Sequence, residues 1–288
     1  MKREKFVVLF CVTVLFLSIN LISQNVVKVD NTLDFLNAIK SNTTIELAPG
    51  TYNLTSVIEE INNVNVGTYN NYDGYEPVLT EVHNLTIKGK GDVKILIEPR
   101  YAWVMTFISC NNLRIEGITF GHTEKGYCAG GVLSFTECSN IVIKSCSLYG
   151  CGTVGINANL CSDVSVINSE IHDCSYGLLY LYDSNDISFK KTMFRNTGEF
   201  NLIEIMNCYN ISFEKCTFKD NYTNEFMPHL FSIDENIWFG YTEDETKLSS
   251  DIWVKKCEFK NNKIQSFVNN DSNFIVVGCK FSNNGFDF

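Results

Sequence analysis

The sequence predicts an all-β solenoid, in which short strands wind through successive coils around one shared core. The first observation is an Asn or Asp followed by an apolar-x-apolar triplet, which recurs with spacings of 28, 28, 23, 23, 24, 41 and 22 residues. Periods of this length are typical of stacked repeats. The second and third observations are that apolar residues and cysteines also recur, each at fixed distances from this Asn or Asp; we call each such set of equivalent positions a column. The recurring residues, here called the corner column, are Asn84, Asn112, Asn140, Asp163, Asp186, Asn210, Asp251 and Asn273.

Each repeat is expected to contain three short strands separated by tight corners. Upstream of the corner column, apolar and polar residues alternate, as in Leu133/Phe135 and Leu179/Leu181, which is the signature of half-buried strands. Asn and Asp suit a corner because they tolerate left-handed backbone angles. One coil cannot bury its apolar face alone, so we expect coils stacked about 4.8 Å apart. Apolar residues eight positions after the corner column are Phe120, Leu148, Ile171, Phe194, Phe218, Phe259 and Phe281.

Residues 1–23 are expected to form a secretory signal peptide. Lys2, Arg3 and Lys5 precede an apolar run from residue 6 to residue 17, which is the usual order in such a segment. The run is short for a membrane span, and an uncleaved segment that anchors the chain in a membrane is the alternative. We therefore expect a protein that is secreted, periplasmic or held at the cell surface.

Residues 24–83 are expected to form the N-terminal cap and the first coil. The stretch "NTLDFLNAIK" at 31–40 is amphipathic and predicts a short helix. A tyrosine-rich insertion at 62–83 follows, and we expect it to leave the coil after the strand that precedes the corner. Residues 84–288 then hold the repeats, which a second insertion interrupts at 236–249.

Two segments resemble the right-handed parallel β-helix, or pectate-lyase-like, superfamily. One is the stacked "xNIxIxxCxFxxN" unit across 84–284, and the other is "TLDFLNAIKSNTTIELAPGTYNL" at 32–54. In that superfamily an amphipathic helix caps the N-terminal end and a Pro-Gly-x-Tyr strand leads into the first coil. The resemblance implies a single right-handed parallel β-helix of three-strand coils with a short N-terminal capping helix. It leaves the function open, because this fold carries lyases, hydrolases, epimerases, esterases, phage tail parts and adhesins.

Ten of the eleven cysteines after Cys11 repeat with the coils, with Ser or Thr at interrupted positions. We interpret them as a cysteine ladder of small side chains at tight inward positions. Disulfides between neighbouring coils, with Cys110–Cys138 and Cys151–Cys174 as the pairs to test, are the alternative. Zinc is disfavoured because no two close pairs of cysteines occur. The columns contain Cys110, Cys138, Cys161 and Cys208, then Cys146, Cys216, Cys257 and Cys279, then Cys151 and Cys174.

Composition and missing motifs exclude several functions. Without the leader the chain has 20 basic and 32 acidic residues, a net charge of −12, which disfavours nucleic acid. Polygalacturonase-like hydrolases carry an aspartate where "TVGINA" and "SYGLLY" have Val154 and Tyr176, and their "GHG" and "RIK" segments are absent. Pectate-lyase-like chemistry requires a basic residue beside calcium-binding aspartates, and we expect neither Arg114 nor Arg195 to lie beside such a cluster. We expect no metal or other cofactor, with calcium as the alternative.

The candidate site is a polar stripe on the outward face of the strand before the corner. Six positions before the corner column stand Thr106, Ser134, Asn157, Tyr180 and Glu204, and four before it stand Ile108, Thr136, Asn159, Tyr182 and Met206. Glu204 is the candidate acid or base, with Tyr180 and Asp183 beside it. His122 and His172 are expected to be solvated turn histidines. The expected substrate-binding residues are Asn157, Asn159, Tyr182, Asp234, Trp238, Tyr241 and Tyr72.

Amides and phenols pair with sugar hydroxyls and aromatic rings stack on sugar faces, so the stripe favours a glycan partner, most of all a neutral one. We expect the two aromatic insertions to form the walls of a groove over it. The leading hypothesis is an exported β-helix protein that binds extracellular polysaccharide and, if catalytic, processes it as a lyase, glycosidase or epimerase. The alternative is a non-catalytic surface, structural or adhesion protein that uses the solenoid as a scaffold. Self-association at the C-terminal end is a further expectation.

Overall fold

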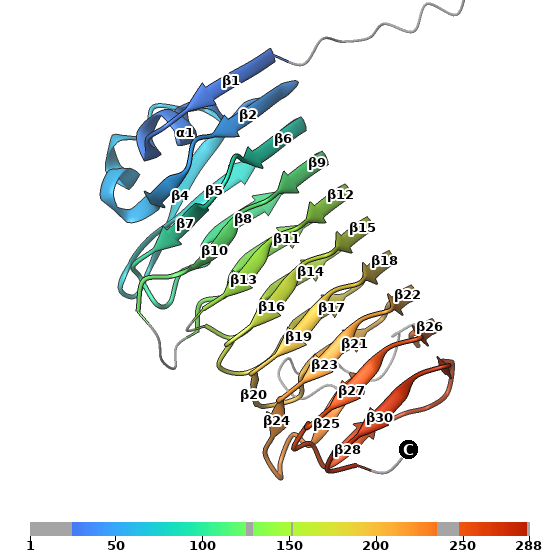
Figure 1. The fold of residues 1–288 in the computed structure, drawn as a ribbon. Coiled ribbons are helices and arrows are strands. Elements are labelled where there is room, and N and C mark those ends of the chain that lie inside the picture. Colours follow the sequence, from blue (N-terminus) through green and yellow to red (C-terminus); the bar gives the residue numbers. More distant parts are fainter. Residues whose placement is uncertain (1–24, 125–128, 151, 235–247, 287–288) are drawn as a thin grey trace, which may run out of the picture.

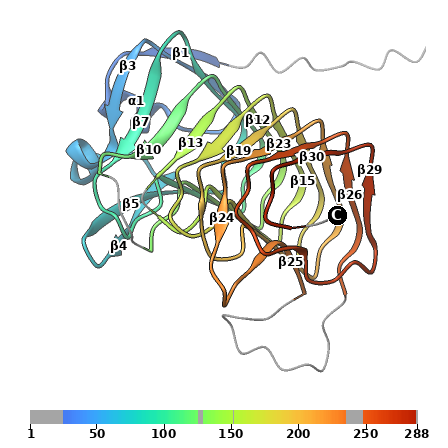
Figure 2. The same cartoon turned by 60° about the horizontal axis from the view of Figure 1, so that its bottom comes forward.

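The structure, a computed structural model, describes residues 25–124, 129–150, 152–234 and 248–286. Over these residues the chain forms a single right-handed parallel β-helix, which confirms the expected fold class. Figure 1 shows the coils stacked along one axis from the blue N-terminal coils to the red C-terminal coils. Figure 2 turns the C-terminal end forward and shows the coils nested behind one another. No helix in the described part of the chain is both long and apolar enough to cross a membrane.

Three long sheets, here called sheets A, B and C, take strands from the successive coils. Sheet A contains, in spatial order, β1 (Asn25–Val29), β2 (Thr43–Leu47), β6 (His83–Gly89), β9 (Asn111–Glu116), β12 (Ser139–Lys144), β15 (Ser162–Ile167), β18 (Asn185–Lys190), β22 (Tyr209–Glu214), β26 (Ser250–Lys255) and β29 (Phe274–Val277). Sheet B contains β3 (Gly50–Asn53), β7 (Val93–Ile97), β10 (Thr119–His122), β13 (Ser147–Tyr149), β16 (Glu170–His172), β19 (Met193–Arg195), β23 (Thr217–Lys219), β27 (Glu258–Lys260) and β30 (Lys280–Ser282). Sheet C contains β4 (Val66–Asn71), β5 (Gly74–Thr80), β8 (Met105–Ile108), β11 (Leu133–Thr136), β14 (Ile156–Asn159), β17 (Leu179–Tyr182), β21 (Ile203–Met206), β25 (His229–Ile233) and β28 (Ser266–Val268). A short pair, β20 (Gly198–Glu199) and β24 (Tyr222–Thr223), joins two of the loops between sheets B and C.

The corner column adopts the left-handed backbone conformation that its residue types predict. All eight residues have φ between 54° and 64°. Their side chains also bond along the stack, because Asn112 Nδ2 donates to Asn84 Oδ1 at 2.6 Å and Asn140 Nδ2 donates to Asn112 Oδ1 at 3.2 Å. The structure differs in one detail, since all of these residues except Asn273 lie inside the sheet A strands. The turn from sheet C into sheet A uses a second left-handed residue three positions earlier, such as Glu137 or Asp183.

The inward residues eight positions after the corner form a continuous aromatic stack in the C-terminal half. The Phe194–Phe218 and Phe218–Phe259 ring centroids lie 4.7 and 4.8 Å apart, with interplanar angles of 10° and 6°. The next pair, Phe259 and Phe281, follows at 4.9 Å. These spacings equal the distance between neighbouring strands of a sheet, so each coil places one ring directly on the next.

The cysteine columns lie at inward positions next to corners, and the nine cysteines in the described residues carry free thiols. Cys138 Sγ accepts a hydrogen bond from the backbone N–H of Cys110 at 3.4 Å. At interrupted positions a hydroxyl takes the same role, because Ser184 Oγ accepts from the N–H of Cys161 at 2.9 Å. A buried N–H requires an acceptor, so Cys, Ser and Thr can alternate in these columns. The Cys110–Cys138 disulfide is absent, and Cys151 lies outside the described residues.

The third column continues beyond Cys174 as buried amides, a feature that the sequence analysis missed. Asn262 Nδ2 donates to Phe218 O at 3.0 Å and to Asn284 Oδ1 at 2.9 Å, while Asn262 Oδ1 accepts from Asn221 Nδ2 at 3.0 Å. Asn221 and Asn262 are each 1% exposed. The sequence contains the pattern that predicts this column, because these asparagines stand eleven positions after their corner residues.

The N-terminal end is closed by the expected helix, α1 (Thr32–Ala38). Its N-cap residue Asn31 accepts from the N–H of Asp34 at 2.9 Å, and its inner face buries Phe35 and Leu36. Figure 1 shows α1 beside the first strands, β1 and β2. A 3₁₀ helix, η1 (Leu54–Glu60), comes after β3 in the chain.

The tyrosine-rich insertion is placed differently from the expectation. It forms an antiparallel hairpin, β4–β5, in which β5 is itself the sheet C strand of the first full coil and pairs with β8. The insertion therefore precedes the corner at Asn84 rather than leaving after the strand. Only β4 is an addition to the solenoid, and it forms the edge of sheet C.

Candidate functional site

The outward face of sheet C carries the polar stripe in the register that the sequence predicts. The parallel pairs align one residue from each of six coils, and at about 4.8 Å per coil the row is about 24 Å long. A second outward row lies two residues further along each strand, and includes Asn159 and Tyr182 as partners. The first row consists of Thr106, Ser134, Asn157, Tyr180, Glu204 and Ser232.

The stripe is not uniformly open to solvent, in contrast to the expectation of an exposed polar face. Thr106 and Ser134 are 8% and 7% exposed at one end, and Glu204 and Ser232 are 6% and 2% exposed at the other. Asn157, Asn159, Tyr180 and Tyr182 are half-buried. The stripe is therefore covered toward both ends and accessible in its middle, over β14 and β17.

The N-terminal end of the stripe is covered by Glu76 of β5. Its carboxylate accepts from Thr106 Oγ1 at 2.9 Å, from Asn71 Nδ2 at 3.0 Å and from the backbone N–H of Trp103 at 2.6 Å. Burial raises the pKa of Glu76 above its ordinary value, and these three hydrogen bonds oppose that rise. The sequence analysis missed Glu76, although it stands eight positions before Asn84 and the register places it on this face.

Tyr180, Tyr182 and Glu204 form the polar cluster next to the accessible part. Tyr182 Oη donates to Glu204 Oε2 at 2.8 Å, and the two tyrosine ring centroids lie 6.0 Å apart. Burial, and then the negative charge of Glu204, raise the pKa of both phenols far above the ordinary value. Both tyrosines therefore remain neutral and keep their O–H groups as donors. The cluster combines two rings, two phenol donors and one oriented carboxyl group.

Asp183 and Asp234 lie at the corner behind this cluster and bond there to Asn207. Asp183 Oδ1 accepts from Asn207 Nδ2. Asp234 accepts from the backbone N–H groups of Asn207 at 3.0 Å and Ser249 at 2.7 Å, and from Ser249 Oγ at 2.6 Å. Asp234 thus stabilises the turn into sheet A. Of the three candidate catalytic residues, the structure brings Tyr180 and Glu204 into one cluster and places Asp183 at its border.

We expected two aromatic insertions to form walls beside the cluster. The one that the structure describes does not lie next to it. Tyr72 is 90% exposed at the hairpin, and its ring lies 5.3 Å from that of Tyr101. The hairpin strand β5 is four strands from β17 in sheet C, or about 19 Å at the usual strand spacing. Trp238 and Tyr241 lie outside the described residues.

A different aromatic pair lies at the entrance to β17 and β21. The rings of Tyr176 and Phe200 stack at 4.6 Å with an interplanar angle of 10°. They stand four positions before Tyr180 and Glu204, respectively, so the register of the repeat would have placed them next to each other. Both are half-buried, which leaves part of each ring accessible beside the strands that carry the cluster.

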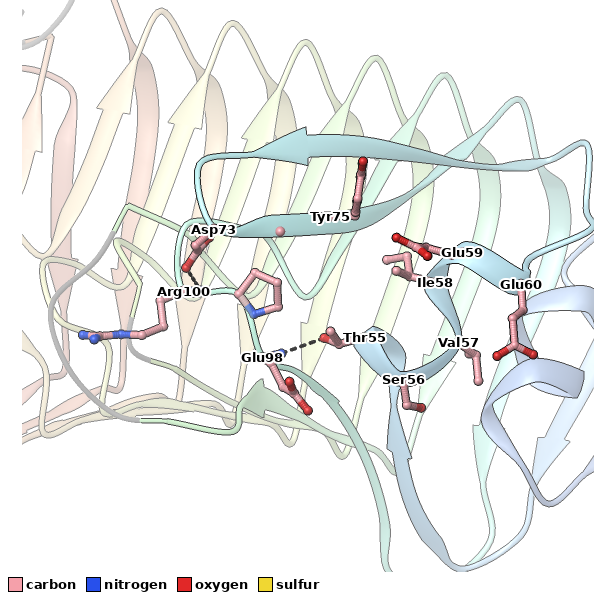
Figure 3. Close-up of a pocket in the computed structure, with 12 residues that line it drawn as sticks. Thr55, Ser56, Val57, Ile58, Glu59, Glu60, Asp73, Tyr75, Glu98 and Arg100 are labelled. Atoms are coloured by element: carbon pink, nitrogen blue, oxygen red, sulfur yellow. Dashed lines mark hydrogen bonds between the residues drawn. The ribbon is translucent and has the colours of Figure 1, made fainter.

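An acidic recess of about 430 Å³ lies near the N-terminal end, between η1, the β4–β5 turn and the segment after β7 (Figure 3). Asp73 accepts from the backbone N–H of Arg100 at 2.6 Å, and Asn53 Nδ2 donates to Glu98 at 2.7 Å. Both carboxylates therefore hold the loops that form the recess. Across the described ranges, no group of three or more His, Cys, Asp or Glu side chains is arranged to hold a metal ion.

The two histidines that we expected in solvated turns lie instead on strands of sheet B. His122 is 2% exposed, its Nε2 donates to Ala102 O at 2.9 Å, and burial lowers its pKa. The His172 side chain is 12% exposed and bonds to Ser147 and Asp173. Arg195 contacts the carboxylates of Glu170 and Asp173, which are one glutamate and one aspartate rather than a cluster of aspartates.

Comparisons with known proteins agree with this architecture. The family model for the right handed beta helix region matches residues 70–227, more than half of the chain. The chain therefore belongs to the right-handed β-helix family. No curated protein sequence matches it.

Solved structures with the same fold include both enzymes and adhesins. A pectate lyase bound to a hexasaccharide is 9% identical, with a TM-score of 0.59 over 92% of this chain and 82% of that one. A pectate lyase from Paenibacillus sp. 0602 is 10% identical, with a TM-score of 0.55 over 83% and 78%. PfbA, a surface adhesin of Streptococcus pneumoniae, is 11% identical, with a TM-score of 0.53 over 91% and 68%. At these identities the likeness concerns the fold alone.

Proposed function

We propose that this chain is an exported β-helix protein that binds extracellular carbohydrate along the outer face of sheet C. The observation that carries the proposal is the accessible middle of the polar stripe, where Asn157 and Asn159 adjoin the Tyr180–Tyr182–Glu204 cluster. Amides, neutral phenols and ring faces together match the hydroxyls and apolar faces of a sugar. The row follows the solenoid axis, so a polymer lying along it would meet one coil after another.

The proposed ligand is a neutral glycan. The chain without its leader has a net charge of −12, and the carboxyl group of Glu204 is the acidic group of the cluster. An anionic polymer would be repelled by these charges. The comparisons support a carbohydrate ligand in general terms, since one structurally similar protein is a pectate lyase bound to a hexasaccharide.

Glu204 is the group that would act as acid or base if the bound glycan is also processed. Glycoside hydrolysis normally requires a pair of carboxyl groups that flank the bond, whereas Glu204 bonds to a phenol. The cluster therefore favours binding, as in an adhesion protein, over hydrolysis. Export rests on the leader at residues 1–23, which lie outside the described residues. Mass spectrometry of the native protein would locate its mature N-terminus.

A glycan array with the mature protein tests the proposal, followed by titration calorimetry on the glycans that bind. Tyr180→Ala removes a ring from the middle of the stripe, and we expect about a tenfold loss of affinity, which corresponds to about 1.4 kcal/mol. Tyr209→Ala is the matched control, because Tyr209 is 52% exposed on sheet A. Absence of binding to every glycan, or equal affinities for the two variants, would refute the proposed site.

Glu204→Gln separates binding from processing. If the protein only binds, the variant keeps its folding and no product appears with either form in reducing-sugar and unsaturated-product assays. A product made by the wild-type protein and lost in Glu204→Gln would assign the enzymatic function instead.

A further inference from the structure

The outer face of sheet B carries a second cluster that the carbohydrate site does not use. Ser147 lies on β13 and Tyr149 two residues later, and in the next coil β16 places Glu170 beside Ser147 and His172 beside Tyr149. Ser147 Oγ lies 2.9 Å from His172 Nε2. His172 Nδ1 lies 2.5 Å from Asp173 Oδ2. A hydroxyl, an imidazole and a carboxylate are thus connected in sequence.

The chemistry of the three groups decides which of them donates. A carboxylate can only accept, so the Nδ1 nitrogen of His172 carries the proton that bonds to Asp173. In the neutral imidazole the other nitrogen, Nε2, then has a free lone pair. Ser147 Oγ–H must therefore donate to Nε2. This is the polarity that a general base needs in order to remove a proton from a serine nucleophile.

Neighbouring side chains hold the imidazole in this orientation. The Tyr149 ring stacks on it, with centroids 5.8 Å apart and an interplanar angle of 27°. Tyr149 in turn lies over Gly121, where a Cβ atom would come within 2.4 Å of the ring. Arg195 lies 3.6 Å from Asp173 Oδ2 and also bonds to Glu170, so it holds both carboxylates in place.

The site is accessible, as a reacting group must be. The side chain of His172 is 12% exposed and that of Asp173 is 39% exposed, and Ser147 is half-buried. A purely structural serine–histidine bond would not require a carboxylate aligned on the far nitrogen. The arrangement meets two of the geometric criteria for nucleophilic catalysis, the nucleophile–base bond and the base–carboxylate bond.

We propose that Ser147, His172 and Asp173 form a serine nucleophile site that reacts with carboxylic esters. Ser147 Oγ attacks the carbonyl carbon while His172 Nε2 takes its proton. The C–O bond to the alcohol then breaks, and the proton passes from His172 to the departing alkoxide, which leaves an ester on Ser147. In the second half, His172 Nε2 takes a proton from water, whose oxygen bonds to the acyl carbon. The bond between that carbon and Ser147 Oγ then breaks, the proton passes from His172 to Oγ, and the carboxylic acid is released. Asp173 holds the imidazole tautomer and balances the imidazolium charge.

The second half of this reaction is expected to be slow. The backbone N–H of Ser147 donates to Ile118 O at 3.1 Å and is engaged in the sheet. The donors nearest in register are the side chains of Thr119 on β10 and, one coil further, Lys94 on β7. Each missing oxyanion donor costs about 10²–10³ in rate. Acylation and deacylation both pass through such an oxyanion, so both should be slow. An activated ester, whose alcohol is a good leaving group, favours acylation over deacylation, so its acyl-enzyme should accumulate and covalent labelling is the sensitive assay.

The experiment treats the full-length protein, without its leader, with a fluorophosphonate probe and with p-nitrophenyl acetate. Intact mass and peptide mapping should show one label on Ser147, and the ester should give a burst of one equivalent of p-nitrophenol. Ser147→Ala should abolish both. His172→Asn should lower the labelling rate about 10²-fold, which is a typical contribution of a general base. Ser165→Ala is the matched control, because Ser165 bonds to Ser188 on sheet A rather than to an imidazole, and it should leave labelling unchanged.

Asp173→Asn separates a positioning role from a structural one. It should lower the maximal labelling rate while the probe concentration for half-maximal rate stays constant, since the carboxylate does not contact the probe. Circular dichroism and thermal melting of each variant report on folding. No label on Ser147 in the folded wild-type protein, or a label on Ser147 that is equally fast in a folded His172→Asn variant, would overturn the proposal.

Discussion

Replacement of Asn262 tests the energetic role of the buried amide column. Its side chain accepts from the backbone N–H of Asn221 at 3.2 Å and donates to the carbonyl of Phe218 at 3.0 Å. It also bonds to the amides of Asn221 and Asn284. Asn262 is 1% exposed, so water cannot readily replace these partners. Asn262→Ala therefore leaves at least one donor and one acceptor of the neighbouring coils without the partner they have in the native protein.

Each buried polar group that loses its partner costs about 1–3 kcal/mol. The loss of the Asn221 N–H and Phe218 carbonyl bonds predicts that Asn262→Ala lowers the free energy of unfolding by about 2–6 kcal/mol. Asn262→Thr should cost less than Asn262→Ala, because Thr197 in the same column uses its hydroxyl to accept from the N–H of Cys174 at 3.3 Å. Lys260→Ala, on the exposed face of β27, should stay within about 0.5 kcal/mol of the wild-type protein.

Urea unfolding followed by circular dichroism and by tryptophan fluorescence measures these differences, and coincident transitions would establish two-state behaviour. Hydrogen exchange of the Asn221 amide gives a local measurement, and this amide should exchange faster in Asn262→Ala. If Asn262→Ala costs less than about 1 kcal/mol, or Asn262→Thr costs as much as Asn262→Ala, the column does not act through hydrogen bonds to the neighbouring coil.

Three further predictions concern other parts of the molecule. Gly121→Ala should destabilise the fold by about 1–3 kcal/mol in urea unfolding, because the new Cβ would overlap the Tyr149 ring; an unchanged midpoint would contradict this. Tyr182→Phe should retain folding and weaken glycan binding severalfold in calorimetry, because Glu204 loses its donor; unchanged affinity would remove Glu204 from the site. Burial raises the pKa of the Cys208 thiol from 9.0 to about 12. Between these two pH values the folded state retains the thiol proton, whereas the unfolded chain loses it. Stability should therefore fall as pH rises above about 9, and Cys208→Ser should flatten that decline in unfolding curves measured from pH 7 to 11.

The fold could be predicted from the sequence because the same residue pattern recurs in every coil. Asn84, Asn112 and their equivalents recur where the chain must adopt positive φ, and the apolar residues alternate between them. In a parallel solenoid, equivalent residues of successive coils are forced to be neighbours. The register alone therefore placed Asn157, Tyr180 and Glu204 in one row, and it could also have found Glu76, Tyr176 and the asparagine column.

The sequence by itself thus determined the coil, its corners, its core and the order of residues along each face. Only the tertiary structure decided which parts of a face are open, because that depends on side chains from other segments, as when Glu76 covers Thr106. It also decided the contact between Ser147 and His172, which are diagonal rather than paired in the register. The repeat period specifies which backbone segments are adjacent. Packing between coils decides which rotamers bring two side chains into contact and which loops bury them.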